Sequence, residues 1–384
     1  MAEVKVLVAG DFCPVAGFEK GIANNAVLGS NAAGSIQELT QDSDCFIVNL
    51  ECPLTGRADR VDKVGPHLRA TPKAAAFLAD LGVNLVTLAN NHIRDAGQMG
   101  VVETLQACKA AGVDTVGAGV NPSGAARIHF MTRKGRILAV INMAEQEFNC
   151  ANSSRGGANP FDIISAIEAV REARKHAHHV LLILHGGLES AHYPSPVSVR
   201  TLRYLAEQGL TAIIRHHPHV VQGHEVWKGV PIFYSLGNFI FNWHTPVMDK
   251  GWYEGILVAL SFDEGDRCSF TIYPFEQCKD TPGIEMMKGA QKVHFMSQYE
   301  AWCKAIEDGA ALQREWRDTL EKRENTYWSS LVLPHNLLAR IARRLGLLKY
   351  FRPSGMHRAI LEHYLRCDAH REAMIGISEQ ARKK

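Results

Sequence analysis

The chain has 384 residues, of which 46% are hydrophobic and 21% are charged, and its formal net charge is +2. This composition is typical of a globular protein with a sizeable core, and the length allows one large domain with an appendage or two to three ordinary domains. A net charge this small excludes a global attraction to nucleic acid, so we expect no nucleic-acid partner.

The cysteines and the N-terminal residues bear on the compartment. Nine cysteines are scattered along the chain and none forms a C-x-x-C pair, which favours a reducing compartment over a disulfide framework. The apolar run in "MAEVKVLVAGDF" is too short for a signal peptide, and no stretch approaches the length of a bilayer span. We therefore expect a soluble, cytoplasmic protein.

Short β-branched runs alternate with helical patterns over the first two thirds of the chain. The helical patterns cover residues 97–111, which Gly112 follows as a C-cap, and residues 160–176. The expected strands are "KVLVAG", "CFIVNL", "NLVTLA", "RILAVINMA", "HVLLILHGG", "TAIIRHH", "PIFYSLGNF" and "GILVALSF". This alternation predicts an α/β sandwich with substantial parallel pairing, in which ligands collect beyond the carboxyl ends of the strands.

After about Asp280 the strand signals disappear, and we expect a domain over residues 1–280 followed by a helical extension over residues 281–384. One helix is expected over residues 304–324. A basic amphipathic helix is expected over residues 337–351, with apolar positions Leu337, Leu338, Ile341, Leu345 and Leu348, and with Arg340, Arg343 and Arg344 outside that face. Such a helix either contacts an anionic membrane or packs on its own domain.

Polar residues follow the expected strands at their carboxyl ends. They are Asp11, Glu51, Asn90, Asn91, His92, His185, His216, His217 and His219. Each alone is explained as a cap, a turn residue or a buried histidine, but so many at equivalent strand ends indicate one site. Carboxylate, amide and imidazole donors without thiolates suit manganese, iron or zinc. We expect replacement of His216 to matter less than that of His217, because neighbouring strand residues point to opposite faces.

The order of these motifs resembles a known family. The segments "GDF", "NLECPLT", "LANNHIRDAGQMGVVETLQA", "HGGLESAHYPSP" and "HHPHVVQGHEVWKGVPIFYSLGNFIF" are similar to the bacterial capsule-synthesis, or poly-γ-glutamate-synthesis (CapA), family within the calcineurin-like metallophosphatase superfamily. The resemblance covers roughly residues 4 to 262. It implies a four-layer α/β/β/α sandwich with one or two divalent transition metals.

The resemblance also implies a role for each motif residue. The first metal site would use Asp11, Glu51 and His219, and the second would use Glu51 as a bridge together with Asn91, His185 and His217. His92 would act on the leaving group as an acid or charge stabiliser. Three positions depart from the superfamily pattern: Cys13 replaces a histidine, Glu51 replaces the bridging aspartate, as fits the capsule-synthesis relatives, and His216 replaces a glycine. The first site is therefore weak, completed by Cys13, or empty.

Two loops supply candidate substrate-binding residues. Residues 143–162 form a long polar loop in which Glu145, Glu147 and Arg155 shape a pocket or simply face solvent. Residues 63–72 contain Lys63, His67 and Arg69, which suit an anionic ligand. A charged loop that faces solvent is the alternative explanation.

The resemblance implies a metal-dependent hydrolase of capsule or poly-γ-glutamate synthesis. Its substrate would be an anionic polymer or a phosphorylated small molecule, cleaved at a phosphoester or a γ-linked amide bond. The ligand types do not distinguish these two chemistries. The alternative is a non-catalytic, polymer-binding accessory protein of an envelope polysaccharide or polyglutamate synthesis machine, because fold alone does not settle function.

Overall fold

The computed structural model of the protein describes residues 3–24, 34–63, 65–241, 250–265, 267–277 and 283–332, with a few residues between 341 and 365. Its larger sheet has eight strands. Their order is β16 (Ile284–Met286), β15 (Cys268–Gln277), β14 (Glu254–Phe262), β1 (Val4–Phe12), β2 (Cys45–Leu50), β3 (Leu85–Thr87) and β4 (Asp114–Val116), and β13 (Asn238–Ile240) also pairs with β1. The pairs β1–β2, β2–β3, β3–β4 and β1–β13 are parallel.

The second sheet has six strands. Their order is β11 (His224–Trp227), β12 (Val230–Phe233), β10 (Ala212–His216), β9 (His179–His185), β7 (Arg136–Ala144) and β6 (His129–Arg133). The four central strands are parallel to one another. A small ribbon joins β5 (Ala118–Gly119) to β8 (Gly157–Ala158). The substantial parallel pairing expected from the sequence is confirmed.

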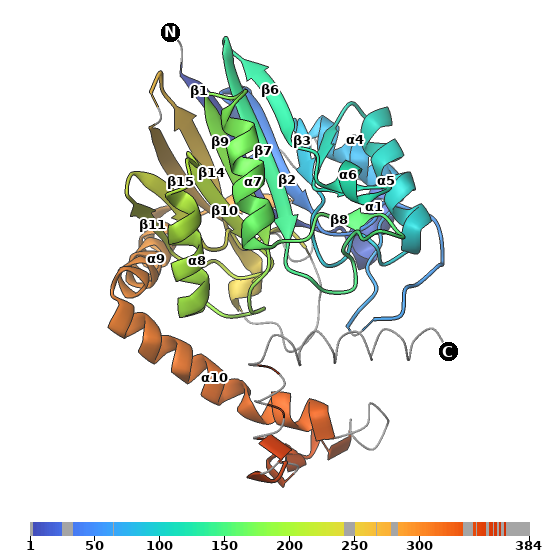
Figure 1. Ribbon diagram of the computed structural model, residues 1–384, viewed down its shortest axis with the longest axis vertical. Helices are drawn as coiled ribbons and strands as arrows, with labels where there is room; N and C mark the ends of the chain where they lie inside the picture. The colour runs from blue at the N-terminus through green and yellow to red at the C-terminus, as the bar shows by residue number, and fades with distance from the viewer. Residues whose placement is uncertain are drawn as a thin grey trace. The chain divides into compact units, whose positions relative to one another are not determined.

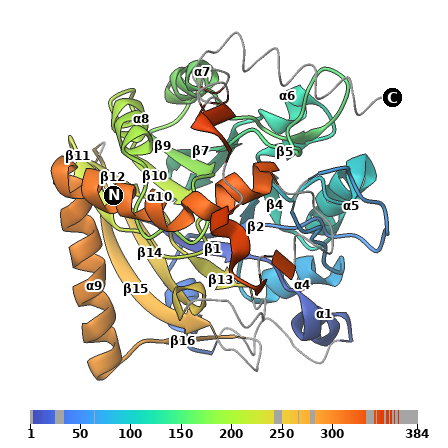
Figure 2. The same cartoon turned by 90° about the horizontal axis from the view of Figure 1, so that it is seen from below.

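Helices cover the outer faces of both sheets. The α-helices are α1 (Ala16–Ala23), α3 (Gln37–Gln41), α4 (Lys73–Asp80), α5 (Gly97–Ala110), α6 (Pro122–Ala125), α7 (Ile163–Arg174), α8 (Pro196–Ala206), α9 (Gly289–Glu307) and α10 (Gly309–Val332), and the 3-10 helices are η1 (Lys250–Tyr253) and η2 (Leu347–Tyr350). Figure 1 shows α7 and α8 in front of β9 and β10, while α9 runs alongside β15 (Figure 2).

Three apolar clusters define four layers. Side chains of β1 and β2 pack against those of β9 and β10 in one cluster, so the two sheets meet face to face. A second cluster joins the eight-stranded sheet to α1, α4 and α5, and a third joins the six-stranded sheet to α7 and α8. The predicted α/β/β/α sandwich is therefore confirmed, with every layer held by burial of apolar surface.

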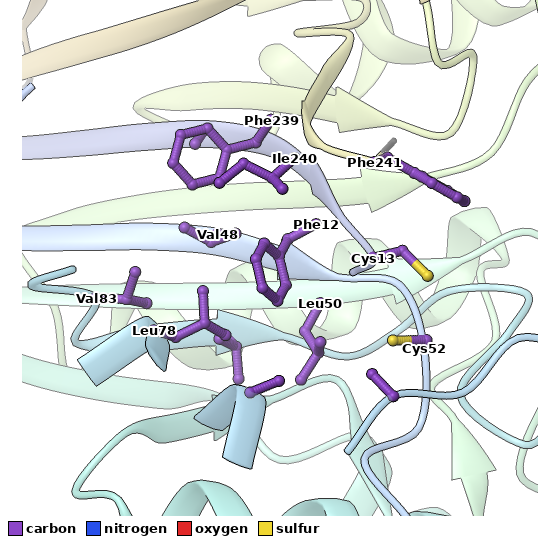
Figure 3. Packing of buried hydrophobic residues seen from close by; sticks show 14 of the residues in the cluster. Phe12, Cys13, Val48, Leu50, Cys52, Leu78, Val83, Phe239, Ile240 and Phe241 are labelled. Atoms are coloured by element: carbon purple, nitrogen blue, oxygen red, sulfur yellow. The ribbon is translucent and has the colours of Figure 1, made fainter. Parts of the chain in front are cut away.

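Strands β1 and β2 show why continuous apolar runs mark this fold. Val6 and Val8 point into the layer between the sheets, whereas Leu7 points toward the helices on the other face. Both faces are buried, so no polar alternation remains. Figure 3 shows Phe12 and Leu50 on the helical face, and Phe12 stacks on Phe77 of α4 with ring centroids 5.9 Å apart.

The C-terminal part differs in several respects from the expectations. The chain forms two compact units, Met1–Gln313 and Arg314–Lys384. Residues 281–313, which we assigned to a helical extension, thus lie in the first unit. They include strand β16, so the expectation that strands end near Asp280 is wrong.

The helix expected over residues 304–324 is interrupted. Asp308 is extended, with ψ of 98°, and it ends α9. Its carboxylate accepts hydrogen bonds from the backbone N–H groups of Ala310 and Ala311, over 3.0 and 3.3 Å, and so caps α10. A good N-cap residue inside a helical pattern therefore marks the start of a second helix.

The basic helix expected over residues 337–351 lies partly outside the described residues. Within them, helix gives way to a turn at Leu345 and Gly346 and then to η2, so one continuous helix is wrong beyond residue 344. Ile341 and Leu345 are exposed, by 43% and 66%. In the described part of the chain, no helix combines the length and apolar character that a bilayer span requires.

Candidate metal centre

The predicted ligands meet where the carboxyl ends of the two sheets come together. Asp11 is the penultimate residue of β1 and Glu51 directly follows β2, both in the eight-stranded sheet. His185 ends β9, and His217 and His219 follow β10 in the six-stranded sheet. All five side chains are buried. Asn91, from the turn after β3, completes the group.

Two backbone features place these side chains. Gly10 lies so close to the turn before β13 that an added Cβ would stand 1.9 Å from the carbonyl oxygen of Gly237. His217 and His219 have φ of 98° and 59°, an unfavourable region for residues other than glycine. Strained residues of this kind cluster at functional sites, and here they turn two imidazoles toward the carboxylates.

Three predicted ligands surround one ring nitrogen of a fourth, His185. The Nε2 atom of His185 is 3.0 Å from Oδ1 of Asn91, 3.1 Å from Nδ1 of His217 and 3.5 Å from Oε1 of Glu51. Donor atoms that share a cation at about 2.1 Å stand about 3.0 to 3.5 Å apart. The set that the resemblance assigned to the second metal site is thus brought together at the spacing of a shared cation.

The residues assigned to the first site also lie together. His219 is 3.4 Å from Asp11 through Nδ1 and 3.6 Å from Glu51 through Nε2. Grouped by distance alone, Glu51 lies with His217 and His219, and also with Asp11 and His185, with all donor atoms of each group within 4.8 Å. Glu51 belongs to both groups, as a bridging ligand must.

Cys13 does not belong to either of these groups among the described residues. Its sulfur lies close to that of Cys52 on the helical side of the sheet (Figure 3). Burial raises the pKa of the Cys13 thiol well above its usual value, and a hydrogen bond with Cys52 adds to the rise. A neutral thiol is a poor metal ligand. Of the three options for the first site, completion by Cys13 is the least supported.

Glu51 provides the test of whether a cation fits. Its side chain is fully buried, and neither carboxylate oxygen has a hydrogen-bond partner in the structure. Burial, followed by the nearby charge of Asp11, raises the pKa of Glu51 well above its usual value. A buried carboxylate without partners is costly, and a cation is the partner that oxygen donors of this kind accept. The residues present therefore fit a divalent cation.

The protonation of His185, His217 and Asp11 agrees with this fit, whereas the pKa of His219 is raised, because its hydrogen bond to Asp11 and the charge of that residue outweigh burial. Burial lowers the pKa of His185 well below its usual value, and burial together with His219 lowers that of His217 to about 3. Both imidazoles are thus neutral, which is the form that binds metals. Burial alone would raise the pKa of Asp11, but the hydrogen bond to His219 and the charges of the neighbouring histidines together outweigh burial, and the net pKa is lowered.

Polar residues behind the ligands hold them in place. The Nδ2 atom of Asn49 donates to Oδ1 of Asp11 over 2.7 Å and lies 3.3 Å from Nδ1 of His185. Thr87 in turn donates to Asn49, and Asn238 lies 3.0 Å from Nδ1 of His219. We did not predict these three residues. A polar side chain inside an otherwise apolar buried strand, such as Asn49 in "CFIVNL", was the available signal.

His216 lies closer to the site than its strand position implied. Its Nδ1 atom is 3.7 Å from Oδ1 of Asp11, and neither ring nitrogen has a hydrogen-bond partner. The side chain points into the layer between the sheets, where Asp11 also lies. The opposite sheet brings Asp11 to this face, and the smaller effect expected for replacing His216 than for replacing His217 stays a prediction.

His92 forms a buried triad with two charged residues. Its Nδ1 atom lies 2.6 Å from Oδ2 of Asp95, whose Oδ1 forms an ion pair with Lys63 over 2.5 Å. A carboxylate only accepts hydrogen bonds, so Nδ1 carries the proton and Nε2 is the acceptor nitrogen. Burial lowers the pKa of His92 despite the neighbouring Asp95. Asp95 was not predicted, and the i, i+3 spacing from His92 was its signal.

The predicted substrate-binding residues lie in different settings. Nε2 of His67 donates to the Val61 carbonyl over 2.6 Å, and Arg69 donates to the Arg57 carbonyl, so both hold their own loop. Glu145 is paired with the buried Arg215 and accepts a hydrogen bond from the Gly187 N–H over 3.1 Å. Glu147 is exposed, and Arg155 is partly buried.

Comparison with known proteins gives consistent relatives. The chain is 29% identical over 255 residues to the PGA biosynthesis protein CapA of Bacillus subtilis, covering 64% of this chain and 65% of that protein. It is 31% identical over 192 residues to the capsule biosynthesis protein CapA of Bacillus anthracis, covering 48% and 45%. The chain thus spans less than two thirds of the length of these relatives.

A structural neighbour is a putative 5'-nucleotidase from Staphylococcus aureus. It has a TM-score of 0.45 and 14% identity, and the alignment covers 78% of this chain and 59% of that one. This similarity is too low to bear on function. The family model described as bacterial capsule synthesis protein PGA_cap matches residues 5–243. That match covers the strands and loops that carry the six candidate ligands, and the chain belongs to the PGA_cap family of bacterial capsule synthesis proteins.

Proposed function

We propose that the protein is a metal-dependent hydrolase of capsule or poly-γ-glutamate synthesis. The observation that carries the proposal is Glu51, a fully buried carboxylate among imidazole and amide donors, for which the described residues provide no hydrogen bond to either oxygen. Structural ion pairs do not leave a carboxylate in this state, because an unpartnered buried charge is strongly destabilising. A cation site explains it.

The chain offers ligands for two cations that share Glu51. Asn91, His185 and His217 would hold one with it, and Asp11 and His219 would hold the other. Manganese, iron or zinc bound there supplies Lewis-acid chemistry and a nucleophile from water at neutral pH. The carboxylates and neutral imidazoles fix the position of the charge, and Asn49 fixes two of the ligands.

His92 has the geometry of a residue that assists the leaving group. Asp95 holds Nδ1 and so leaves Nε2 to interact with the substrate, next to the ligand Asn91. The ion pair between Lys63 and Asp95 holds that carboxylate in place, and the ring with it. Once Nε2 has taken up a proton, His92 would carry that proton to the departing oxygen or nitrogen, or hold the negative charge that develops there.

The substrate class rests on the family. Relatives are named for capsule, PGA and polyglutamine synthesis. We therefore propose an anionic polymer or a phosphorylated precursor, cleaved at a phosphoester or γ-linked amide bond. A cytoplasmic location and membrane contact through residues 337–351 remain parts of this proposal.

A non-catalytic accessory role is the second candidate. It is favoured by Cys13, which stands at the histidine position of the first site and turns to Cys52 instead of the ligands. A protein reduced to polymer binding would tolerate such a loss. This candidate predicts polymer binding without turnover under any metal.

Metal analysis with a substrate screen tests the proposal. Protein purified without chelator should contain at least one transition metal per chain, and the His185→Ala/His217→Ala variant should contain far less. Phosphoesters and γ-linked glutamyl peptides, each with manganese, iron or zinc added, should reveal turnover that this variant lacks. Equal metal content in the two proteins contradicts the metal site, and metal binding without turnover of any substrate supports the accessory role.

A further inference from the structure

Two arginines lie near each other on segments that are joined to the turn carrying Asn91 and His92. Arg94 follows His92 by two residues in the turn before α5, and Arg155 comes from the long loop between β7 and α7. Arg94 is only 8% exposed, and its Nη1 donates to the Phe148 carbonyl of that loop over 3.2 Å. The Nε atoms of both arginines are buried and have no hydrogen-bond partner.

The loop is shaped to hold Arg94. A Cβ added to Gly157 would stand 2.7 Å from Cδ of Arg94 and 2.2 Å from the Asn149 carbonyl oxygen, so only glycine fits there. The side chain of Asn149 donates to the carbonyl of Asn90, next to the ligand Asn91. The loop, and Arg155 with it, is thus anchored to the turn that carries Asn91 and His92.

This arrangement is electrostatically unfavourable by itself. Burial, and then the positive charge of Arg155, lowers the pKa of Arg94 to about 10. Among the described residues, no ion pair or hydrogen bond involves the side chain of Arg155, and none pairs Arg94 with a carboxylate. Two like charges brought together beside a buried site, with unused N–H groups, lack the anion that would offset their repulsion.

We propose that Arg94 and Arg155 form a subsite for an oxyanion group of the substrate, a carboxylate or a phosphate. Guanidinium N–H groups match the planar or tetrahedral oxygens of such groups, and two of them can clamp one anion. The proposal rests on the proposed function only for the identity of the substrate, since anion binding here requires no metal and no turnover.

Calorimetric titration tests this subsite directly. Inorganic phosphate and glutarate are each titrated into full-length protein in the presence of chelator, so that bound metal does not attract the anion. Wild-type protein should bind at least one probe, and Arg155→Gln and Arg94→Lys should each weaken that binding by about tenfold or more. The double variant should lose little more than either single variant, because both arginines would hold the same anion.

Arg171→Gln is the matched control, since Arg171 is an exposed arginine on α7 and its replacement removes the same charge. It should bind like wild type. Binding of phosphate alone, or of glutarate alone, identifies the oxyanion and supports the subsite. No binding of either probe by folded wild-type protein, or wild-type affinity in Arg155→Gln, overturns it. Failure of the hydrolase proposal would instead appear as absent turnover with anion binding intact.

Thermal unfolding separates the subsite from a structural role. If Arg155 only braced the loop, Arg155→Gln would lower the Tm. A residue placed for a ligand leaves the Tm unchanged or raises it in the absence of anion, because its replacement relieves repulsion from Arg94. A clear drop in the Tm of this variant without anion would contradict the proposal.

Discussion

Asp95 follows His92 by three residues in the turn before α5 and holds its Nδ1 atom at 2.6 Å, while the same carboxylate is paired with Lys63. All three side chains are buried or nearly so, with exposures of 1%, 7% and 4% for Asp95, His92 and Lys63. The Asp95 carboxylate therefore holds the His92 ring, and Lys63 holds that carboxylate. This arrangement leads to the first two predictions.

His92→Asn should keep metal content and folding but lose most turnover. Loss of a general acid lowers a rate by about 10²- to 10⁴-fold, which corresponds to about 3 to 5 kcal/mol of barrier. Steady-state kinetics with the substrate found in the screen, alongside elemental analysis, measures both properties. An unchanged kcat would leave hydrolysis in place and refute only this role for His92.

Asp95→Ala should destabilise the fold, because it leaves the Lys63 ammonium buried without its partner. Breaking a buried pair in this way costs about 3 to 5 kcal/mol. Lys63→Met/Asp95→Ala should recover part of that loss, since the unpaired charge is gone. Urea unfolding of both variants and of Lys63→Met completes the double-mutant cycle. A double variant no more stable than Asp95→Ala would show that the pair is not the cause.

Asn49→Ala should weaken metal binding while the ligands themselves stay intact. Asn49 donates to Asp11 and lies against His185, so its loss frees a ligand in each group. Loss of such a supporting residue lowers metal affinity by about 10- to 100-fold. Competition with a chelator of known affinity measures the change. Wild-type affinity in the variant would mean that the strand backbone alone positions Asp11.

His224 predicts a loss of stability in acid. It stacks between Phe233 and Tyr299 and joins β11 to α9, and burial lowers its pKa to about 4. The unfolded chain binds this proton from about pH 6.5 downward, whereas the folded protein does not until about pH 4. Stability is therefore lost as the pH falls between these values, by at most about 3 kcal/mol.

His224→Phe is the comparison for this prediction, because it keeps the aromatic stack and removes the titration. Other buried histidines titrate in both proteins, so the quantity to measure is the unfolding free energy of wild type minus that of the variant, at each pH from 7 to 4. That difference should fall as the pH falls, because only wild type loses the contribution of His224. Parallel curves for the two proteins would exclude His224 as a source of acid sensitivity.

The sequence pattern located the candidate ligands that meet between the sheets, but not the residues that support them. Each candidate ligand could be located because a buried strand has a recognisable end, and the parallel order brings those ends together. The second sheet changed what lies beside them: His216 shares a strand face with core residues, and only the opposing sheet places Asp11 against it. Pairs such as Lys63 and Asp95 depend on the conformation of loops. Loops have no repeating residue pattern from which their conformation could be predicted.

The same reason explains the errors in the C-terminal part. Strand β16 has three residues and pairs with β15 at the edge of the sheet. It is too short to show an alternation of apolar and polar residues in the sequence. Asp308 reads as one polar residue within a helical pattern, although its capping hydrogen bonds separate two helices. Glu145 was a candidate either for a substrate pocket or for a solvent-facing loop, and the structure pairs its carboxylate with the buried Arg215. Contacts between side chains far apart in the sequence can be recognised only in the folded structure.

The ligands come from both sheets, Asp11 and Glu51 from one and His185 and His217 from the other. A cation bound between them would act as a cross-link across the sandwich, so metal occupancy and folding become a single linked equilibrium. Loosening the apolar layer between the sheets, for example by Ile183→Ala, would then weaken cation binding from a distance. At saturating metal, each tenfold loss of affinity for the cation would lower the free energy of unfolding by about 1.4 kcal/mol. Metal supply in the cell would thereby set how long the folded protein persists.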